Sequence, residues 1–418
     1  MRSGVRSPSA PPFARTIRET TDSVALNPAS RIVKIALRIG LILATSFVLI
    51  EGLMIVLDPY VFKGRFEYDR DLGFKVRAYY PNGFGMYGES DDGTLTNRFG
   101  FNAPDYPLTK APGTFRIVVV GDSFGWAGGL KGNYTHLLQQ LFDQRGDRRI
   151  EIINTGYPGT HTGEELAMLK KYALQYDPDL VVLGFFAGND FFEADPNRKR
   201  IVLNDCLLDI DRRHERQLAG YPLVFTSRLW LFLSQKYELY ERAREADREA
   251  QEWAEANGQA APRRTDPERI FYQMQHAKLE FFNRQTSATQ FGPNIDFIFR
   301  SISEMNELLK ARHVKFMVAI FPDVLQVSAA QFDVLVNRFG LRRDDYDLDL
   351  AQTRIRSYLD SQEISYLDLL ARFRIEEQQR ELYRFRNAHW NQAGNQLAAE
   401  LLIDYLKNSP AGQKLMSH

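Results

Sequence analysis

Five short runs of β-branched and aromatic residues between residues 114 and 370 constrain the fold more than any other feature of the chain. They are Arg116–Val120, Ile150–Asn154, Leu180–Phe186, Val314–Phe321 and Ile364–Leu369. Their nearly continuous hydrophobicity is typical of strands that are covered on both faces. Helical patterns lie between them, such as the three- and four-residue apolar steps from Ile295 to Leu309. The alternation predicts a three-layer α/β/α fold around a parallel sheet, with ligands at the carboxyl ends of its strands.

The composition excludes several classes of function. Lys and Arg together number 53, as do Asp and Glu, so the chain lacks the basic footprint of a nucleic-acid-binding protein. The single cysteine, Cys206, excludes an internal disulfide framework and a cysteine-rich metal site. The seven histidines include no H-x-x-x-H pair, and we expect neither a metal nor another cofactor. With 418 residues and 44% apolar composition, the chain is long enough for one large catalytic domain.

The amino-terminal region differs from the rest of the chain. Residues 1–31 are rich in Ser, Pro, Ala and Arg without apolar periodicity, which is typical of a disordered tail. From Ile35 to Leu57 the chain is apolar and long enough to cross a bilayer, with Arg38 and Glu51 near its ends. Basic residues dominate the amino-terminal flank, so we expect a cytoplasmic tail, a signal-anchor at 32–57 and an exported remainder. A signal peptide and a buried core helix are the alternatives.

The rest of the chain divides into three parts. Residues 58–112 form a juxtamembrane segment rich in Gly, Asn, Asp and Tyr, and residues 113–408 contain the five runs. Between the third and fourth runs, residues 195–293 form an insertion far longer than a loop needs. Within it, the apolar stripe from Leu239 to Trp253 predicts a long amphipathic helix at about 226–257. That helix either packs on its own domain, forms a lid over the site, or binds a protein partner.

The first apolar run leads into a candidate nucleophile. The stretch "GDSFG", Gly121 to Gly125, satisfies the G-x-S-x-G pattern of α/β-hydrolases. In that fold, however, several strands precede the nucleophile, and one of them carries a loop of the oxyanion hole. Here Ser123 ends the first convincing strand, and residues 60–112 show neither feature. The α/β-hydrolase pattern is therefore incidental.

Four separated stretches resemble, in order, the blocks of the SGNH (GDSL) hydrolase superfamily. They are "GDSF" with Ser123, "NTGYPG" with Gly156, "FAGND" with Asn189 and "NAHWNQAG" with His389. The resemblance spans roughly residues 114–406 and implies the SGNH hydrolase fold, with a flavodoxin-like five-stranded sheet. It also implies that Ser123 is the nucleophile and His389 its general base.

The chemistry of acyl transfer accounts for these residue types. A serine hydroxyl becomes a good nucleophile when an imidazole takes its proton. Attack on an ester creates an oxyanion, for which the resemblance supplies the Ser123 and Gly156 amides and the Asn189 side chain. Taken singly, each residue also fits a purely structural role: Ser123 as a helix cap, Asn189 as a turn residue and His389 as a packed histidine. Their joint occurrence in the family's order favours an active site.

One position departs from the family pattern. An acidic residue lies two or three positions before the histidine in the family, whereas this chain has Asn387 and Arg386 there. An Asn387 oxygen can orient the imidazole without stabilising its charged form, and Asp368 at the end of the last run is an alternative partner. The site is then either weakly active or a binding site on an enzyme fold.

Together these features predict a single-pass protein of the cytoplasmic membrane, with a serine esterase domain on the periplasmic or extracellular side. Families that this chain resembles act on acyl esters, often acetyl groups of envelope or exported polysaccharides, so we expect a carbohydrate ester as substrate. A catalytically silent partner in polysaccharide modification or export, and an acyltransferase using the same residues, remain alternatives. Hydrolysis and transfer share an acyl-Ser123 intermediate and differ only in the acceptor.

Overall fold

The computed structural model describes residues 28–61, 64–81, 94–146, 149–204, 206–211, 217–218, 221–222, 227–234, 236–237, 240, 244 and 267–417. The chain forms two compact units, Met1–Ile55 and Val56–His418. Within the first unit lies most of α1 (Pro28–Val61), a single continuous helix. Its residues Arg31–Asp58 are long and apolar enough to cross a membrane. The tail expected at residues 1–31 lies almost entirely outside the described residues.

A parallel five-stranded sheet forms the centre of the second unit. Its strands are β3 (Phe115–Gly121), β4 (Ile150–Asn154), β5 (Leu180–Phe186), β10 (Lys315–Phe321) and β11 (Ser365–Asp368). The spatial order is β11-β10-β5-β3-β4, with every neighbouring pair parallel. Counted along the chain this is 2-1-3-4-5, so the flavodoxin-like sheet is confirmed. The order reverses at β3 and β5, which are neighbours, and ligands bind at such a switch point.

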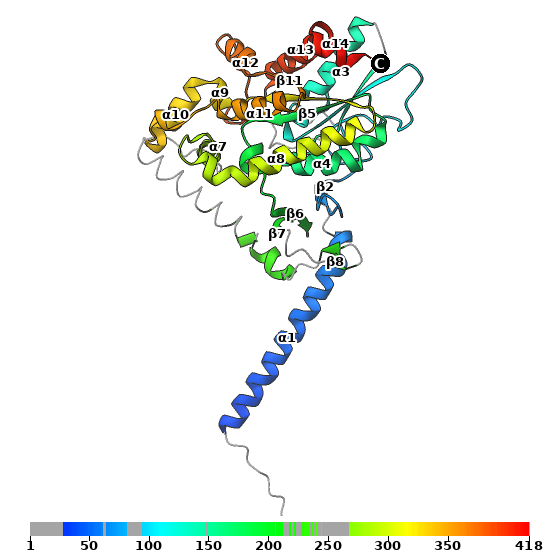
Figure 1. Cartoon of the computed structure of the whole chain (residues 1–418). Coiled ribbons are helices and arrows are strands. Elements are labelled where there is room, and N and C mark those ends of the chain that lie inside the picture. Colours follow the sequence, from blue (N-terminus) through cyan, green and yellow to red (C-terminus); the bar gives the residue numbers. More distant parts are fainter. Residues whose placement is uncertain are drawn as a thin grey trace, which may run out of the picture. The chain divides into compact units, whose positions relative to one another are not determined.

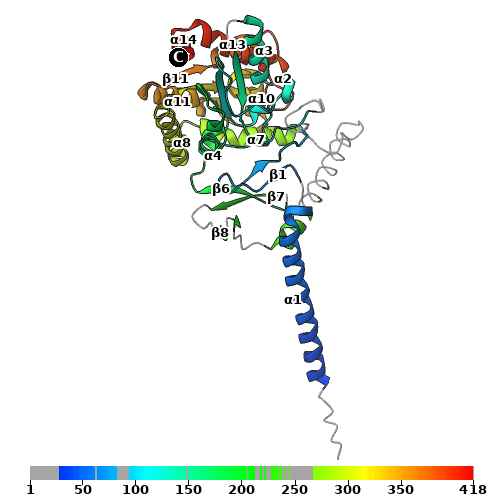
Figure 2. The ribbon, with the colours of Figure 1, turned by 90° about the vertical axis from the view of Figure 1, so that its right-hand side faces the viewer.

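Helices cover both faces of this sheet (Figure 1). On one face α3 (Tyr134–Arg145) packs against α13 (Gln392–Asn408), and on the other α4 (Thr162–Lys171) packs against α8 (Ser287–Lys310). Figure 2 shows the same layers from the side. The other described helices of this unit are α2 (Gly129–Gly132), α5 (Asp190–Glu193), α7 (Pro267–Phe282), α9 (Val324–Val327), α10 (Ala329–Phe339), α11 (Leu350–Ser361), α12 (Leu370–Glu377) and α14 (Pro410–Met416).

The insertion begins with strands, which precede the helix expected at about 226–257. β6 (Arg198–Leu203) and β7 (Cys206–Asp211) pair antiparallel, and β8 (Gln217–Leu218) pairs with β9 (Tyr221–Pro222). The ladder from Arg198↔Asp211 to Leu203↔Cys206 closes in a tight turn, which favours a hairpin over a helix. Residues 228–234 are helical. The stripe from Leu239 to Trp253 lies outside the described residues.

The segment expected to be juxtamembrane packs against the sheet domain. Two short strands, β1 (Phe66–Glu67) and β2 (Lys75–Val76), flank a turn that carries Asp69. Both carboxylate oxygens of Asp69 accept hydrogen bonds from Lys171 Nζ at 2.8 Å, and the Tyr172 hydroxyl donates to Oδ2 at 2.8 Å. Since Asp69 is 5% exposed, these bonds hold the segment to the end of α4 without an unpaired buried charge.

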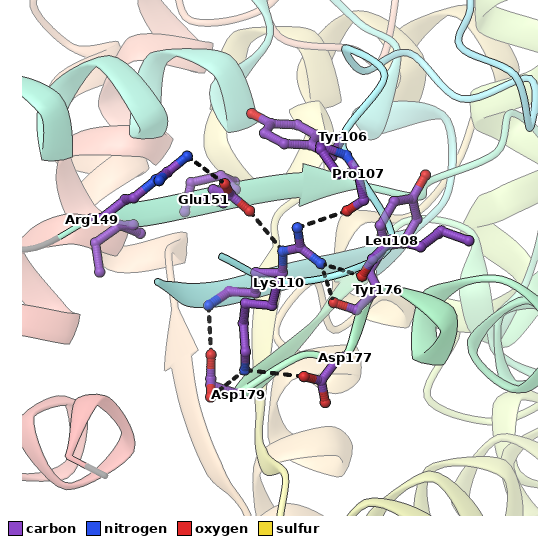
Figure 3. Close-up of polar contacts among 12 residues, drawn as sticks. Tyr106, Pro107, Leu108, Lys110, Arg149, Glu151, Tyr176, Asp177 and Asp179 are labelled. Atoms are coloured by element: carbon purple, nitrogen blue, oxygen red, sulfur yellow. Dashed lines mark hydrogen bonds and ion pairs between the residues drawn. The ribbon is translucent and has the colours of Figure 1, made fainter. Parts of the chain in front are cut away.

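At the amino-terminal edge of the sheet, a buried arginine binds the chain that leads into β3. The Arg116 guanidinium donates to Glu151 Oε2 at 2.7 Å, and to the backbone oxygens of Pro107, Leu108 and Tyr176 at 2.7–2.8 Å. Figure 3 shows Glu151 beside this network and Lys110 between Asp177 and Asp179. Four of the five N–H groups of the buried guanidinium therefore have a partner, and the Glu151 carboxylate balances its charge, as a stable buried ion pair requires.

Candidate active site

Ser123 lies directly beyond the carboxyl end of β3, in a single 3-10 turn (Ser123–Gly125). The turn is fixed at both ends. Asp122 Oδ1 accepts a hydrogen bond from Phe124 N at 2.9 Å, and Asn133 Nδ2 donates to the oxygens of Phe124 and Ala127. Ser123 itself is 8% exposed. A side chain on so short and well-bonded a turn is held in one position, as a nucleophile requires.

His389 lies in the loop between α12 and α13. Arg386 adopts the left-handed backbone (φ 53°) that turns the chain there, and the neighbouring Trp390 is fully buried. Trp390 also forms a β-bridge with Tyr383, which closes the loop. These contacts place His389 Nε2 2.7 Å from Ser123 Oγ, across 266 residues of sequence. The distance is that of a hydrogen bond between a nucleophile and its base.

Asn387 occupies the place of the missing acid and makes contact with the imidazole. Its Oδ1 lies 2.7 Å from His389 Nδ1 and accepts the His389 backbone N–H at 2.9 Å. Because a backbone N–H can only donate, the atom facing it is the amide oxygen, and the oxygen in turn requires the proton on Nδ1. Nε2 is then left with the lone pair that can take the serine proton.

Asp368, the alternative partner, lies elsewhere. Its Oδ1 accepts the backbone N–H of Leu370 at 3.0 Å, and its Oδ2 lies 3.5 Å from Arg356 NH1. The carboxyl group therefore caps the start of α12 and pairs with α11. Asn387, not Asp368, is the side chain that meets the Nδ1 of His389 in this structure.

The surroundings of His389 oppose its protonation. Burial, together with the charges of Lys278 and Arg384, lowers the pKa of His389 to about 3. The ring also faces Phe124 with 5.1 Å between ring centroids, so an apolar surface replaces water on that side. An imidazole in this environment is neutral at physiological pH and able to accept a proton, and the side chain at its Nδ1 is an amide instead of a carboxylate.

The three expected oxyanion donors differ in availability. Within the described residues, neither the Ser123 backbone N–H nor the Asn189 side-chain NH₂ donates to another protein group, while Asn189 Oδ1 is buried. The Gly156 N–H instead donates to Asn154 Oδ1 at 3.0 Å. A Cβ on Gly156 would lie 3.0 Å from the Asp122 carbonyl oxygen, so glycine permits the second block to pack on the nucleophile turn. Ser123 and Asn189 are thus the free donors, and Gly156 can contribute only by sharing its proton.

A family model matches the carboxyl-terminal part of the chain. Residues 281–418, which contain His389 and Asn387, match the family model described as "SGNH hydrolase-like domain, acetyltransferase AlgX". This carboxyl-terminal third of the chain is similar to an SGNH hydrolase-like domain. The family resemblance expected from the four sequence blocks is therefore confirmed, and we call the second unit the SGNH domain.

Solved structures of esterases and acylhydrolases share similarity with the SGNH domain. An acetyl xylan esterase is 14% identical over 69% of this chain and 98% of its own, with a TM-score of 0.37. A lipase/acylhydrolase from Enterococcus faecalis is 14% identical over 70% and 95%, with a TM-score of 0.35. The esterase EstA from a Pseudoalteromonas species is 10% identical over 70% and 96%, with a TM-score of 0.34. No curated protein matches the chain.

Three buried carboxyl groups behind the site were not expected. Asp122 precedes Ser123, Asp190 follows Asn189, and Glu165 lies in the first turn of α4; all three are at most 1% exposed. Burial raises the pKa of Asp122 to about 7, and burial with mutual repulsion raises the pKa values of Glu165 and Asp190 well above their usual range. These groups therefore hold protons where exposed carboxyls would lose them. Asp122 and Asp190 belong to two of the four motif blocks, whereas the position of Glu165 in the sequence carried no signal of this proximity.

A buried lysine from the insertion also reaches the site. Lys278 in α7 is 7% exposed; its Nζ lies 3.9 Å from Asp323 Oδ2 and 5.1 Å from the centre of the Phe186 ring. Phe186 ends β5, three residues before Asn189, so the ammonium lies at the same edge of the sheet as the nucleophile. The sequence spacing could have indicated that Lys278 is buried. It lies three or four residues from the buried Gln275 and Phe282, and Phe271 continues the same helical face.

Among the residues that the structure describes, no group of three or more His, Cys, Asp or Glu side chains is arranged to hold a metal ion.

Proposed function

We propose that this protein is a membrane-anchored serine esterase that removes an acyl group, acetyl in the leading case, from an envelope or exported carbohydrate. The observation that carries the proposal is the 2.7 Å contact between Ser123 Oγ and His389 Nε2, with the Nδ1 proton directed at Asn387 Oδ1. A hydroxyl bonded to a neutral imidazole of the correct tautomer is an activated nucleophile.

The proposed reaction proceeds in two halves. As Ser123 Oγ attacks the ester carbonyl carbon, its proton passes to His389 Nε2, and the oxyanion accepts hydrogen bonds from the Ser123 N–H and the Asn189 NH₂. Collapse expels the sugar oxygen, which takes the proton from Nε2 and leaves an acyl-Ser123 ester. Water then attacks that ester by the same steps in reverse, and the acid is released.

Asn387 sets the expected speed of this reaction. Its oxygen fixes the tautomer but brings no negative charge to the imidazolium that forms in each half. Lys278 and Arg384 disfavour that imidazolium further. We therefore expect turnover that is slow for a serine esterase, with activity that persists into acidic solution because the base is protonated only near its lowered pKa.

Acyl transfer is the second candidate, and the family description favours it by naming an acetyltransferase. In this version the acyl-Ser123 intermediate is resolved by a sugar hydroxyl instead of water. The acceptor's proton passes to His389 Nε2, so no additional protein group is needed. Both versions keep the same nucleophile and base.

The place of the reaction is part of the proposal. The apolar helix Arg31–Asp58 supports an anchor that leaves the SGNH domain outside the cytoplasmic membrane, where envelope carbohydrates are found. A protein partner that binds through residues 226–257 belongs to this proposal as a separate expectation.

The test measures acetate release from p-nitrophenyl acetate and from an acetylated oligosaccharide by the purified full chain. Ser123→Ala should abolish release from both, whereas Ser328→Ala, a serine at the start of α10, should leave it unchanged. Addition of an unacetylated oligosaccharide separates the two versions, since a transferase moves acetyl to that acceptor and an esterase does not. Equal acetate release by the Ser123→Ala variant would overturn the proposal.

A further inference from the structure

The insertion presents a helical face of large apolar side chains to solvent. Residues 228–234, 236, 237 and 240 are helical, and four of them are strongly exposed: Trp230 (68%), Leu233 (50%), Tyr237 (65%) and Tyr240 (62%). Trp230 and Leu233 lie three residues apart on one side of the helical stretch 228–234, and Tyr237 and Tyr240 continue the three- and four-residue spacing in the sequence. We call this set the aromatic face. Exposed apolar surface of this size and regularity on a soluble domain marks a binding surface.

The opposite side of the same helix packs on the β6–β7 hairpin. Leu231, 7% exposed, lies in a small core with Ile201 and Leu203 of β6. The helix is therefore held in a defined orientation, with the aromatic face directed away from the hairpin. Its outward side chains are part of a folded element and not of a loose end.

The hairpin, in turn, binds the residue at which the candidate membrane span ends. Asn204, next to Leu203 at the hairpin turn, donates its backbone N–H to Asp58 Oδ1 at 2.8 Å. Asp58 is the last residue of the span Arg31–Asp58 and lies in the second unit. The point where the chain leaves the bilayer is thus connected to the aromatic face through Asn204, Leu203 and Leu231.

We propose that the aromatic face lies in the headgroup layer of the membrane that α1 crosses, as a second membrane contact of the SGNH domain. This inference rests on the proposed membrane anchor. Trp and Tyr favour the interface because their rings are apolar and their N–H and O–H groups remain hydrated there. Lys236, exposed beside Tyr237, supplies a charge suited to anionic headgroups.

A lipid surface fits this face better than a protein does. Four side chains within eleven residues of sequence are enough for interfacial binding but few for a stable protein interface. The anchor also keeps the aromatic face next to the bilayer at high effective concentration, so a weak intrinsic affinity is sufficient. The contact would hold the site at a fixed distance from the membrane surface.

The test uses the full chain in nanodiscs of phosphatidylcholine and phosphatidylglycerol, with Cys206→Ser removing the native thiol. A polarity-sensitive fluorophore is attached at Leu233→Cys or, separately, at Tyr240→Cys. Ile375→Cys, an equally exposed apolar position in α12, is the matched control. Leu43→Cys in the middle of α1 reports on the anchor itself. Nitroxide lipids carry the quencher either near the headgroups or near the bilayer centre.

Labels at 233 and 240 should shift to the blue and lose emission to the headgroup quencher, whereas the label at 375 should do neither. The label at 43 should lose emission to the central quencher. Quenching at 43 without quenching at 233 and 240 would overturn the aromatic-face proposal, would leave the anchor intact, and would assign the face to a protein partner. No quenching at position 43 would show that the proposed anchor itself is wrong.

Discussion

At the scale of single residues, the decisive feature is the amide that faces the imidazole of His389. Asn387 directs its oxygen to Nδ1 because the His389 backbone N–H occupies the same atom. In serine proteases, the corresponding Asp→Asn change imposes the wrong tautomer and costs about 10⁴ in turnover. Here the tautomer is correct, so the amide's deficit relative to an aspartate is the missing charge.

Asn387→Asp should therefore raise turnover on p-nitrophenyl acetate, by about 10- to 100-fold, which is well below the serine-protease figure. The new carboxylate also raises the pKa of His389 from about 3. Only the neutral imidazole accepts the serine proton. The fall of kcat at low pH should therefore begin at a higher pH in the variant than in the wild type. His389→Ala should remove activity in either background. An unchanged rate and an unchanged acid limb would contradict the assigned role of Asn387.

The buried carboxyl of Glu165 should make stability depend on pH. Its pKa is raised well above 4.5 in the folded protein, so below that pH the group is protonated in both the folded and the unfolded chain and adds no pH dependence. Above it, the unfolded chain releases the proton while the folded chain keeps it, and stability falls by about 1.4 kcal/mol per pH unit until the folded group titrates. Glu165→Gln removes this loss, so the variant's gain in Tm over wild type should be larger at pH 8 than at pH 5.

Glu164→Gln is the matched control for that measurement. Glu164 lies next to Glu165, but its carboxylate accepts a hydrogen bond from Arg200 at 2.6 Å. Loss of the Glu164 charge should therefore lower Tm at both pH values. Differential scanning fluorimetry of the full chain in detergent gives both comparisons. A Tm difference for Glu165→Gln that stays constant with pH would show that Glu165 carries no raised pKa.

At the scale of elements, the five central strands could be predicted because residues buried on both faces leave an unbroken apolar run in the sequence. Predicted and observed bounds agree to within one residue, as for Arg116–Val120 against β3 (Phe115–Gly121). The four motif blocks likewise follow strands or precede helices, so their meeting at one edge followed from the topology.

Other parts of the site could not be predicted from the sequence. Lys278 comes from an insertion that no strand pattern places, and its contact with Asp323 depends on how α7 packs. The hydrogen bond from Gly156 to Asn154 depends on the backbone conformation of the turn, and residue types alone do not specify that conformation. The β6–β7 hairpin was missed because its polar and apolar residues are too mixed to distinguish a strand from a helix.

The Arg116 network makes a prediction about the stability of the sheet. Arg116→Met should destabilise the SGNH domain by about 3–5 kcal/mol, because it leaves Glu151 and three backbone oxygens without their donor. Arg149→Met is the control: its guanidinium lies 3.7 Å from Glu151 but is 64% exposed, so its loss should cost at most about 1 kcal/mol. Chemical denaturation checks both. Equal costs would contradict a structural role for the buried arginine.

At the scale of the whole molecule, the proposed function requires an exported domain on an uncleaved anchor. A reporter enzyme that is active only outside the cytoplasm, fused after His418, should be active, because a basic amino-terminal flank favours an amino terminus in the cytoplasm. The fusion should also remain in membranes after a high-salt wash. An inactive reporter would reverse the orientation, and a shortened chain in the soluble fraction would show that the apolar helix is a cleaved signal.

The most direct test of the central claim is covalent labelling of the nucleophile. The purified full chain is treated with a fluorophosphonate probe, and the modified residue is located by peptide mass spectrometry. We expect one adduct, on Ser123. Labelling should be strongly reduced in the His389→Ala variant and absent from the Ser123→Ala variant, and Tm should be nearly unchanged in both. A wild-type chain that stays unlabelled, or that is labelled on another residue, would contradict the assignment of Ser123 and His389 as a catalytic pair.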